Sequence, residues 1–165
     1  MQGVQRIKSS GFTLMELIAV IVVLVVLASA VTLINTDPNL TTYHDADKLA
    51  ADIRYVQSYS MTHADNYSIL ISENSGVWQY QLFLDATPLR NPTTGSTDAV
   101  TLLSTVTLPS EISAGRITFD GRGVPYGNSD AELTTTAVIT LAFENDRDTE
   151  VHVTPKVGKV TVVPV

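Results

Sequence analysis

The apolar positions of the chain are concentrated in one run near its N-terminus. From Leu17 to Val31 there are fifteen residues, of which only Ser29 is polar. Residues 12–34 number 23, and a helix of that length, at roughly 1.5 Å per residue, spans about 35 Å. Because the hydrocarbon core of a bilayer is about 30 Å thick, we predict a transmembrane helix over residues 12–34.

A second helical pattern, amphipathic rather than apolar, covers residues 35–66. We expect an interruption near its start, because Pro38 lacks an amide hydrogen and disfavours helix at the residue before it. Apolar or small side chains then recur at three- and four-residue spacing, at Tyr43, Ala46, Leu49, Ala50, Ile53, Val56 and Ser60. The charged residues Asp45, Lys48, Asp52 and Arg54 fall elsewhere on the helical wheel. The pattern predicts one packed face, with Lys48 and Asp52 forming a weak i, i+4 pair outside it.

Beyond residue 66 the pattern changes to the alternation typical of β-strands, with turn signals between the runs. The predicted strands cover residues 67–72, 77–84, 100–108, 116–119, 137–143, 150–154 and 159–163. The polar stretch within residues 88–98 is predicted to be a mobile loop. A long helix followed by antiparallel strands indicates an α+β fold, in which the amphipathic helix covers one β-sheet of a globular head at 67–165.

Composition and charge exclude several classes of function. The net charge is −7, with 17 acids against 10 bases, and there is no cysteine. Removing residues 1–11 would take away two bases and no acid, leaving −9. Phosphate backbones require clustered Lys and Arg, so nucleic-acid binding is not expected. Without cysteine the chain has no disulfide, metal thiolate or thiol nucleophile.

Candidate catalytic and metal-binding residues are scarce. We find no Gly-x-Ser-x-Gly, phosphate loop or His-Glu-x-x-His, and no two carboxylates in an apolar setting, so no catalytic residue and no enzyme activity are predicted. The histidines, His44, His63 and His152, lack a metal-ligand spacing, and His152 is expected to face solvent from a strand. The acidic stretches 128–132 and 144–148 offer oxygen ligands for calcium, but neither matches a calcium-loop signature. Solvated turns are the favoured interpretation, so no metal or cofactor is predicted.

The predicted transmembrane stretch, residues 12–34, contains an acid near its start, Glu16. A carboxylate within a bilayer costs about 2.5 to 3.5 kcal/mol and usually finds a partner there. Three interpretations compete: a cleaved secretory signal ending near 28–30, an uncleaved signal anchor, and a short basic leader that is cleaved after Gly11. In the last two, Arg6 and Lys8 keep the N-terminus cytoplasmic.

Of these three interpretations, only cleavage after Gly11 explains why an acid, Glu16, lies in this apolar stretch. It would create a cationic amino terminus at Phe12, at a depth similar to that of the carboxylate. Helix geometry keeps the two groups of one chain about a turn apart, so the amine of a neighbouring subunit is the better partner. Glu16 would then fix the axial register between subunits in an assembly.

The sequence GFTLMEL at 11–17, followed by an aliphatic helix, resembles the class III signal of type IV pilins and pseudopilins. The resemblance implies cleavage after Gly11 by a membrane-embedded prepilin peptidase, methylation of the Phe12 amine, and a role for Glu16 in subunit addition. It implies a structural subunit in the bacterial inner membrane, single-pass, with a cytoplasmic N-terminus and a periplasmic head. Its partners would be the peptidase, an inner-membrane assembly platform and other subunits of a type IV pilus or a type II secretion pseudopilus.

The C-terminal region is similar to H-type minor pseudopilins and FimT-like minor pilins. The residues at matching positions are Phe119, Gly121, Gly123, Pro125, Gly158 and Lys159. Glycines at such places favour tight turns with positive φ. Two alternatives to a purely structural subunit remain: a head that binds a surface, DNA or an exported protein, and a monomeric membrane-anchored periplasmic protein.

Overall fold

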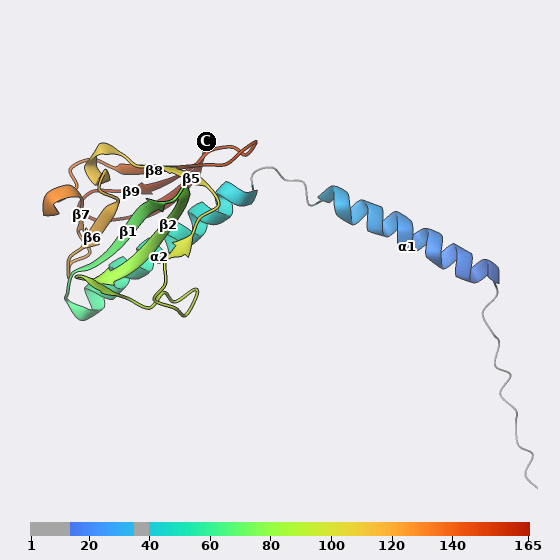
Figure 1. The fold of residues 1–165 in the computed structure, drawn as a ribbon, viewed down its shortest axis with the longest axis horizontal. Helices are drawn as coiled ribbons and strands as arrows, with labels where there is room; N and C mark the ends of the chain where they lie inside the picture. Colours follow the sequence, from blue (N-terminus) through green and yellow to red (C-terminus); the bar gives the residue numbers. More distant parts are fainter. Residues whose placement is uncertain (1–13, 35–39) are drawn as a thin grey trace, which may run out of the picture. The chain divides into compact units, whose positions relative to one another are not determined.

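The computed structural model describes residues 14–34 and 40–165, and side chains at 14–25 and 40–165. The chain divides into two units, residues 1–37 and 38–165, each described here by itself (Figure 1). The predicted cleavage residues Gly11 and Phe12 and the predicted interruption at Pro38 lie outside the described residues.

The first unit contains one helix, α1 (Leu14–Ile34, 21 residues). Its sequence is apolar around the whole circumference, and every side chain from Leu14 to Val25 is exposed. From Leu14 to Val25 the helix therefore buries no face in its own unit, unlike the surface helix of a globular domain. Among the fully described residues, no helix combines the length and the hydropathy that crossing a membrane requires.

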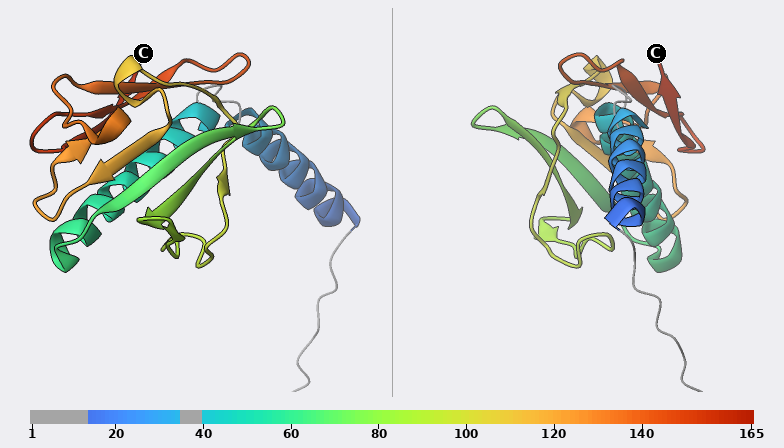
Figure 2. Two further views of the ribbon diagram at one scale, coloured as in Figure 1. Left: turned by 60° about the vertical axis from the view of Figure 1, so that its left-hand side comes forward. Right: turned by 90° about the vertical axis from the view of Figure 1, so that its right-hand side faces the viewer.

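The second unit, which we call the head, packs helix α2 (Leu40–His63) against two antiparallel sheets (Figures 1 and 2). The six-stranded sheet has the order β3-β2-β1-β6-β7, with β4 also pairing with β2. Its strands are β1 (Tyr67–Asn74), β2 (Val77–Leu84), β3 (Thr87–Pro88), β4 (Val100–Thr101), β6 (Arg116–Phe119) and β7 (Pro125–Tyr126). The four-stranded sheet has the order β10-β9-β8-β5. Its strands are β5 (Thr105–Thr107), β8 (Ala137–Ala142), β9 (Thr149–Val153) and β10 (Val160–Pro164).

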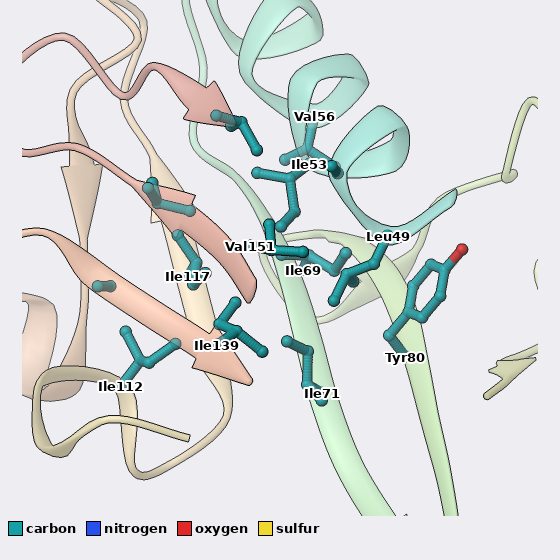
Figure 3. Close-up of a cluster of buried hydrophobic side chains, with 14 of the residues drawn as sticks. Leu49, Ile53, Val56, Ile69, Ile71, Tyr80, Ile112, Ile117, Ile139 and Val151 are labelled. Carbon is teal, nitrogen blue, oxygen red and sulfur yellow. The ribbon is translucent and has the colours of Figure 1, made fainter. Parts of the chain in front are cut away.

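The hydrophobic core lies between α2 and the two sheets. Leu49, Ile53 and Val56 of α2 point toward side chains of both sheets (Figure 3). The sheet residues labelled there include Ile69, Ile71, Tyr80, Ile117, Ile139 and Val151. The core residues of the described chain all lie between Ala46 and Val160. The α+β class and the packed face of α2 are thus confirmed, and the head carries a core of its own.

The expected single sheet is wrong, and the strand predicted at 100–108 is divided. β4 pairs with β2 of one sheet, whereas β5 pairs with β8 of the other. Between them, a carboxylate oxygen of Asp45 accepts the N–H groups of Leu103 and Ser104 at 2.8 and 2.9 Å and the Ser104 hydroxyl at 3.0 Å. Because these donors bond to α2, the chain leaves one sheet at this point and enters the other.

Two aspartates predicted on the outer side of α2 are buried instead. Asp45 is 5% exposed and Asp52 is 1% exposed, whereas Tyr43, predicted on the packed face, is 48% exposed. Asp52 accepts hydrogen bonds from the Tyr80 hydroxyl (2.7 Å) and the Asn91 amide (2.6 Å). It is held by these neutral donors, rather than by the predicted pair with Lys48.

The predicted mobile loop within residues 88–98 is anchored by the same aspartate. Besides the bond from Asn91, Asp52 accepts one from the Thr93 hydroxyl at 3.2 Å. Asn91 is 2% exposed, and its side-chain oxygen in turn accepts the Thr93 N–H at 2.7 Å. The polar composition of this loop therefore serves a buried hydrogen-bond network.

Candidate assembly site

The predicted N-terminal site is described only from α1 onward. Glu16 lies in the first turn of α1, where the positive end of the helix dipole favours an acid. The predicted cleavage and methylation residues, Gly11 and Phe12, precede the described residues. The part of the site that the structure places is thus the carboxylate and the helix that carries it.

From Leu14 to Val25, the surface of α1 is aliphatic apart from Glu16. The exposed fraction is 76% for Leu14, 58% for Leu24 and 46% for Val20, with similar values for the apolar residues between them. Exposed apolar surface of this extent is unfavourable in water and marks a helix that is covered by lipid or by other helices. The described part of α1 therefore presents apolar surface that would be more stable covered than in water.

The head holds an acidic loop at the start of α2. Asp146 accepts the Thr42 N–H at 3.2 Å, and the Thr42 hydroxyl donates to the Arg147 carbonyl at 2.9 Å. The carboxylate thus satisfies one of the amides left free at a helix N-terminus. The stretch 144–148 forms a turn tied to α2. Within the described residues, no group of acids and histidines is arranged to hold a metal ion.

The second half of α2 holds two further loops. The side-chain amide of Gln57 donates to the carbonyls of Gly123 (2.9 Å) and Val157 (2.8 Å). Gly158 has a φ of +62°, and an added Cβ would lie 2.5 Å from the Gln57 amide nitrogen. The predicted need for glycine at Gly158 is therefore confirmed, because only the smallest residue permits this contact.

A polar hollow of about 500 Å³ lies beside the six-stranded sheet. Its lining residues are Asn66, Ser68, Asp85, Arg116, Thr118, Asp120, Tyr126 and Asp130. Arg116 donates to the Ser68 hydroxyl at 2.6 Å and its guanidinium carbon lies 5.1 Å from the centre of the Phe83 ring. No histidine lines this hollow, so it offers polar contacts rather than a nucleophile beside a base.

Asp120, at one side of this hollow, has a perturbed pKa. Partial burial of the carboxyl raises its pKa, but hydrogen bonds from the N–H groups of Val124 and Arg122 and from the Arg122 guanidinium outweigh burial. The net result is a pKa below the ordinary value. The guanidinium–carboxylate pair has two contacts, at 3.0 and 2.8 Å, and fixes the turn that precedes β7.

The three histidines lie in separate environments. The His152 ring nitrogen is 2.7 Å from a carboxylate oxygen of Glu150, and the His152 side chain is 27% exposed, so it faces solvent only in part. His63 stacks on Tyr59 with the ring centres 4.0 Å apart. His44 lines a shallow hollow at the start of α2. The structure does not bring them together.

Sequence reasoning missed the residues that join the head's loops to α2. Thr42, Asp45, Asp52 and Gln57 bond to groups that lie between 28 and 105 residues away in the chain. Helical spacing contains no signal for such partners. The one hint was that all four are polar residues within an otherwise regular amphipathic helix.

Comparisons with known proteins agree with the N-terminal motif and the fold. A family model described as the prokaryotic N-terminal methylation motif matches residues 6–32, which include Gly11, Phe12 and Glu16. No curated protein sequence shows a significant match. The chain is similar to the crystal structure of the type IV minor pilin FimU of Pseudomonas aeruginosa strain PAO1, with a TM-score of 0.51 and 15% identity. The match covers 73% of this chain and 91% of that one.

At this identity, the structural likeness shows the fold, whereas the matched motif supplies the sequence evidence. The matched motif includes most of the apolar helix α1, and the α+β fold is similar to that of the minor pilin FimU. This chain thus carries the prokaryotic N-terminal methylation motif together with a fold similar to that of the type IV minor pilin FimU.

Proposed function

We propose that this chain is a minor pilin, a structural subunit that is cleaved after Gly11, methylated on Phe12 and built into a filament. The observation that carries the proposal is the methylation motif matched at residues 6–32, a range that includes Gly11, Phe12 and Glu16. The apolar sequence of α1 supports it. The likeness of the head to a structure titled a minor pilin supports a minor role. The filament is a type IV pilus or a type II secretion pseudopilus.

In this proposal α1 acts twice. Before assembly its aliphatic cylinder anchors the subunit in the bacterial inner membrane, with the head in the periplasm. During assembly an inner-membrane platform adds the subunit, and packing against the α1 helices of other pilins replaces contact with lipid. Lipid tails are as apolar as leucine, so this exchange is driven by close packing and polar contacts rather than by the hydrophobic effect.

Glu16 supplies the polar contact. The carboxylate pairs with the methylated Phe12 amine of a neighbouring subunit and thereby fixes the height at which α1 enters the assembly. A carboxylate costs about 2.5 to 3.5 kcal/mol within a bilayer, so a subunit placed at the wrong height forfeits that amount. This cost is large enough to select one register over others.

Two measurements test the proposal. The intact mass of the mature protein should show loss of residues 1–11 and gain of one methyl group. Glu16→Ala should remain in the membrane but be lost from filaments at least about tenfold, the ratio expected when roughly 1.4 kcal/mol or more is removed. Met15→Ala, an apolar change in the same turn of α1, is the matched control and should assemble normally.

Two results would contradict the proposal. An uncleaved chain, or cleavage near Ala30, would indicate a monomeric anchored protein or a secretory signal. Filaments that incorporate Glu16→Ala as well as Met15→Ala would show that the carboxylate does not set the register.

A further inference from the structure

The head exposes apolar side chains at both ends of α2, and the charges around the two groups are opposite. The group at the start of α2, which we call the proximal patch, consists of Leu40, Leu103, Phe143, Glu144 and Asp148. The group near its end, which we call the distal patch, consists of Met61, Val157, Arg122, Lys156 and Lys159. Leu40 and Leu103 are 68% and 69% exposed, and Met61 and Val157 are 55% and 73% exposed.

The proximal patch is one continuous surface. Leu103 lines two adjoining shallow hollows, one shared with Leu40 and the other with Phe143 and Glu144. The acidic loop is held there by the bonds between Thr42 and residues 146–147. Asp146 is engaged with α2, so Glu144 and Asp148 supply the exposed negative charge. The exposed Arg147 offsets part of it, and the loop 144–148 keeps three acids against one base.

The distal patch is continuous as well. Gln57 bonds to the carbonyls of Gly123 and Val157, which brings the loop after β6 against the hairpin between β9 and β10. A Cβ added at Gly123 would lie 2.8 Å from the Met61 sulfur, so Met61 borders the same loops. Arg122 is paired with Asp120. The excess positive charge therefore comes from Lys156 and Lys159, both exposed.

We propose that the distal patch of one head docks on the proximal patch of a second copy of this chain. Apolar side chains would then meet apolar ones, and the two lysines would meet Glu144 and Asp148. Such a contact is heterologous: each copy keeps one patch free, so that docking continues into an open row rather than a closed dimer. That geometry suits a filament subunit.

The charges favour this partner over others. An anionic lipid surface or a nucleic acid would be repelled by the acids of the proximal patch and could meet only the lysines of the distal patch. Two unpaired lysines are few for a phosphate backbone, on a head whose 15 acids and 8 bases give a net charge of −7. The complementary surface, basic around apolar residues, is present on the chain itself.

The contact needs help to form, because exposed ion pairs contribute only about 0.2 to 1 kcal/mol each. This inference rests on the proposed function in one respect: α1 anchors copies in one membrane or filament. Anchoring raises the effective concentration of heads toward the millimolar range, at which weak patches engage.

The absence of cysteine from the chain allows a clean crosslinking test. Full-length Leu103→Cys and Val157→Cys variants are co-expressed, and membranes of these cells are treated with a mild oxidant. We expect a crosslinked dimer from the mixture and none from either variant alone. Thr97→Cys is the matched control, since Thr97 is exposed but lies outside both patches, on a loop bonded to Gln81. Mixed with Val157→Cys, it should not crosslink.

Charge reversal separates docking from unfolding. Lys156→Glu with Lys159→Glu in the Val157→Cys chain should lower the dimer yield at least about tenfold. Adding Glu144→Lys and Asp148→Lys to the Leu103→Cys chain should restore it. The inference would be overturned if the added lysines did not restore the dimer, or if Thr97→Cys crosslinked equally well. Binding of the head to duplex DNA through the distal patch would overturn it as well.

The outcome also distinguishes this inference from the proposed function. If the mature chain begins at methylated Phe12 and enters filaments but gives no Leu103–Val157 crosslink, the docking inference alone is wrong. If the heads crosslink while the chain keeps residues 1–11, the proposed function is wrong and the docking contact stands.

Discussion

The two helices are similar in length, 21 residues in α1 and 24 in α2, but place their acids in opposite settings. α2 is polar overall and buries a seam that includes Asp45 and Asp52, each surrounded by hydrogen-bond donors from the head. α1 is aliphatic on all sides, and its single acid, Glu16, lies among exposed apolar side chains.

The difference separates a helix that organises a fold from one for which we propose a role in assembly. In α2 the buried carboxylates hold loops of the same chain, so their desolvation is offset within the head. In α1 the apolar side chains from Leu14 to Val25 are exposed, and we propose that lipid or other chains cover them. Four predictions test this contrast, in order of decreasing effect.

The largest effect on stability is expected at Asp52, one of the two buried acids of α2. Asp52→Ala leaves three donors, on Tyr80, Asn91 and Thr93, without their acceptor. Because an unpaired buried donor costs about 1 to 3 kcal/mol, the free energy of unfolding should fall by about 4 kcal/mol. Urea denaturation of residues 40–165 measures it. Asp47→Ala, at an exposed acid of α2, should change the value by less than about 0.5 kcal/mol. Equal losses would show that burial is not the cause.

The second prediction places a new acid in each helix. Val22→Glu in α1 should disfavour membrane insertion by about 3 kcal/mol, whereas Ser58→Glu, on the exposed side of α2, should have no effect on it. The readout is the fraction of full-length protein that stays in the membrane after alkaline extraction. Retention of Val22→Glu at the normal level would mean that α1 is not held by lipid.

The third prediction concerns one donor to Asp52. Burial raises the pKa of the Tyr80 hydroxyl far above 10.0, and its hydrogen bond to Asp52 acts in the same direction. Tyr80→Phe should lower the free energy of unfolding by about 1 to 1.5 kcal/mol at neutral pH. Since the raised pKa belongs to the folded state, stability due to Tyr80 is complete below pH 10 and declines above it.

Its control is Tyr43→Phe, because Tyr43 is 48% exposed and should tolerate the change. Denaturation at several pH values should show that the unfolding free energies of the unsubstituted protein and of Tyr80→Phe converge above pH 10. A difference that stays constant with pH would contradict the assignment.

The smallest effect is expected at an acid outside both helices. The pKa of Asp120 is lowered in the folded state, so its contribution is present above the ordinary value of 3.8 and lost as the pH falls through the lowered pKa. Asp120→Asn should lower the free energy of unfolding by less than about 1 kcal/mol at pH 7, since Arg122 is well exposed. Glu132→Gln is the exposed control. A loss of stability in Asp120→Asn that persists at pH values below the lowered pKa would rule out the charge of Asp120 as its source.

Local pattern located most elements of the head because each depends on neighbouring residues. The strand predicted at 77–84 coincides with β2, and the strand predicted at 116–119 coincides with β6. The pattern failed at 102–104, where alternation continues but Asp45 removes the donors from the ladder. That carboxylate lies 58 residues away from Leu103 in the chain, beyond the reach of any periodicity.

The same distinction applies to the sites. Gly11, Phe12 and Glu16 lie within one short motif, so their predicted roles could be formulated from the sequence, and the matched family model covers them. The distal patch combines α2 with residues 121–123 and 155–159, which only the folded head brings together. The positive charge of the distal patch was not evident from the sequence, because the chain as a whole is strongly acidic.

One consequence of α2 concerns distance. Thr42 positions the acidic loop and Gln57 positions the basic hairpin, with one uninterrupted helix between them. At about 1.5 Å per residue these anchor points are roughly 22 Å apart along the axis. α2 thus sets the distance between the acidic loop and the basic hairpin. Each residue inserted between Thr42 and Gln57 would lengthen that distance by about 1.5 Å and rotate one anchor point relative to the other by about 100° about the helix axis.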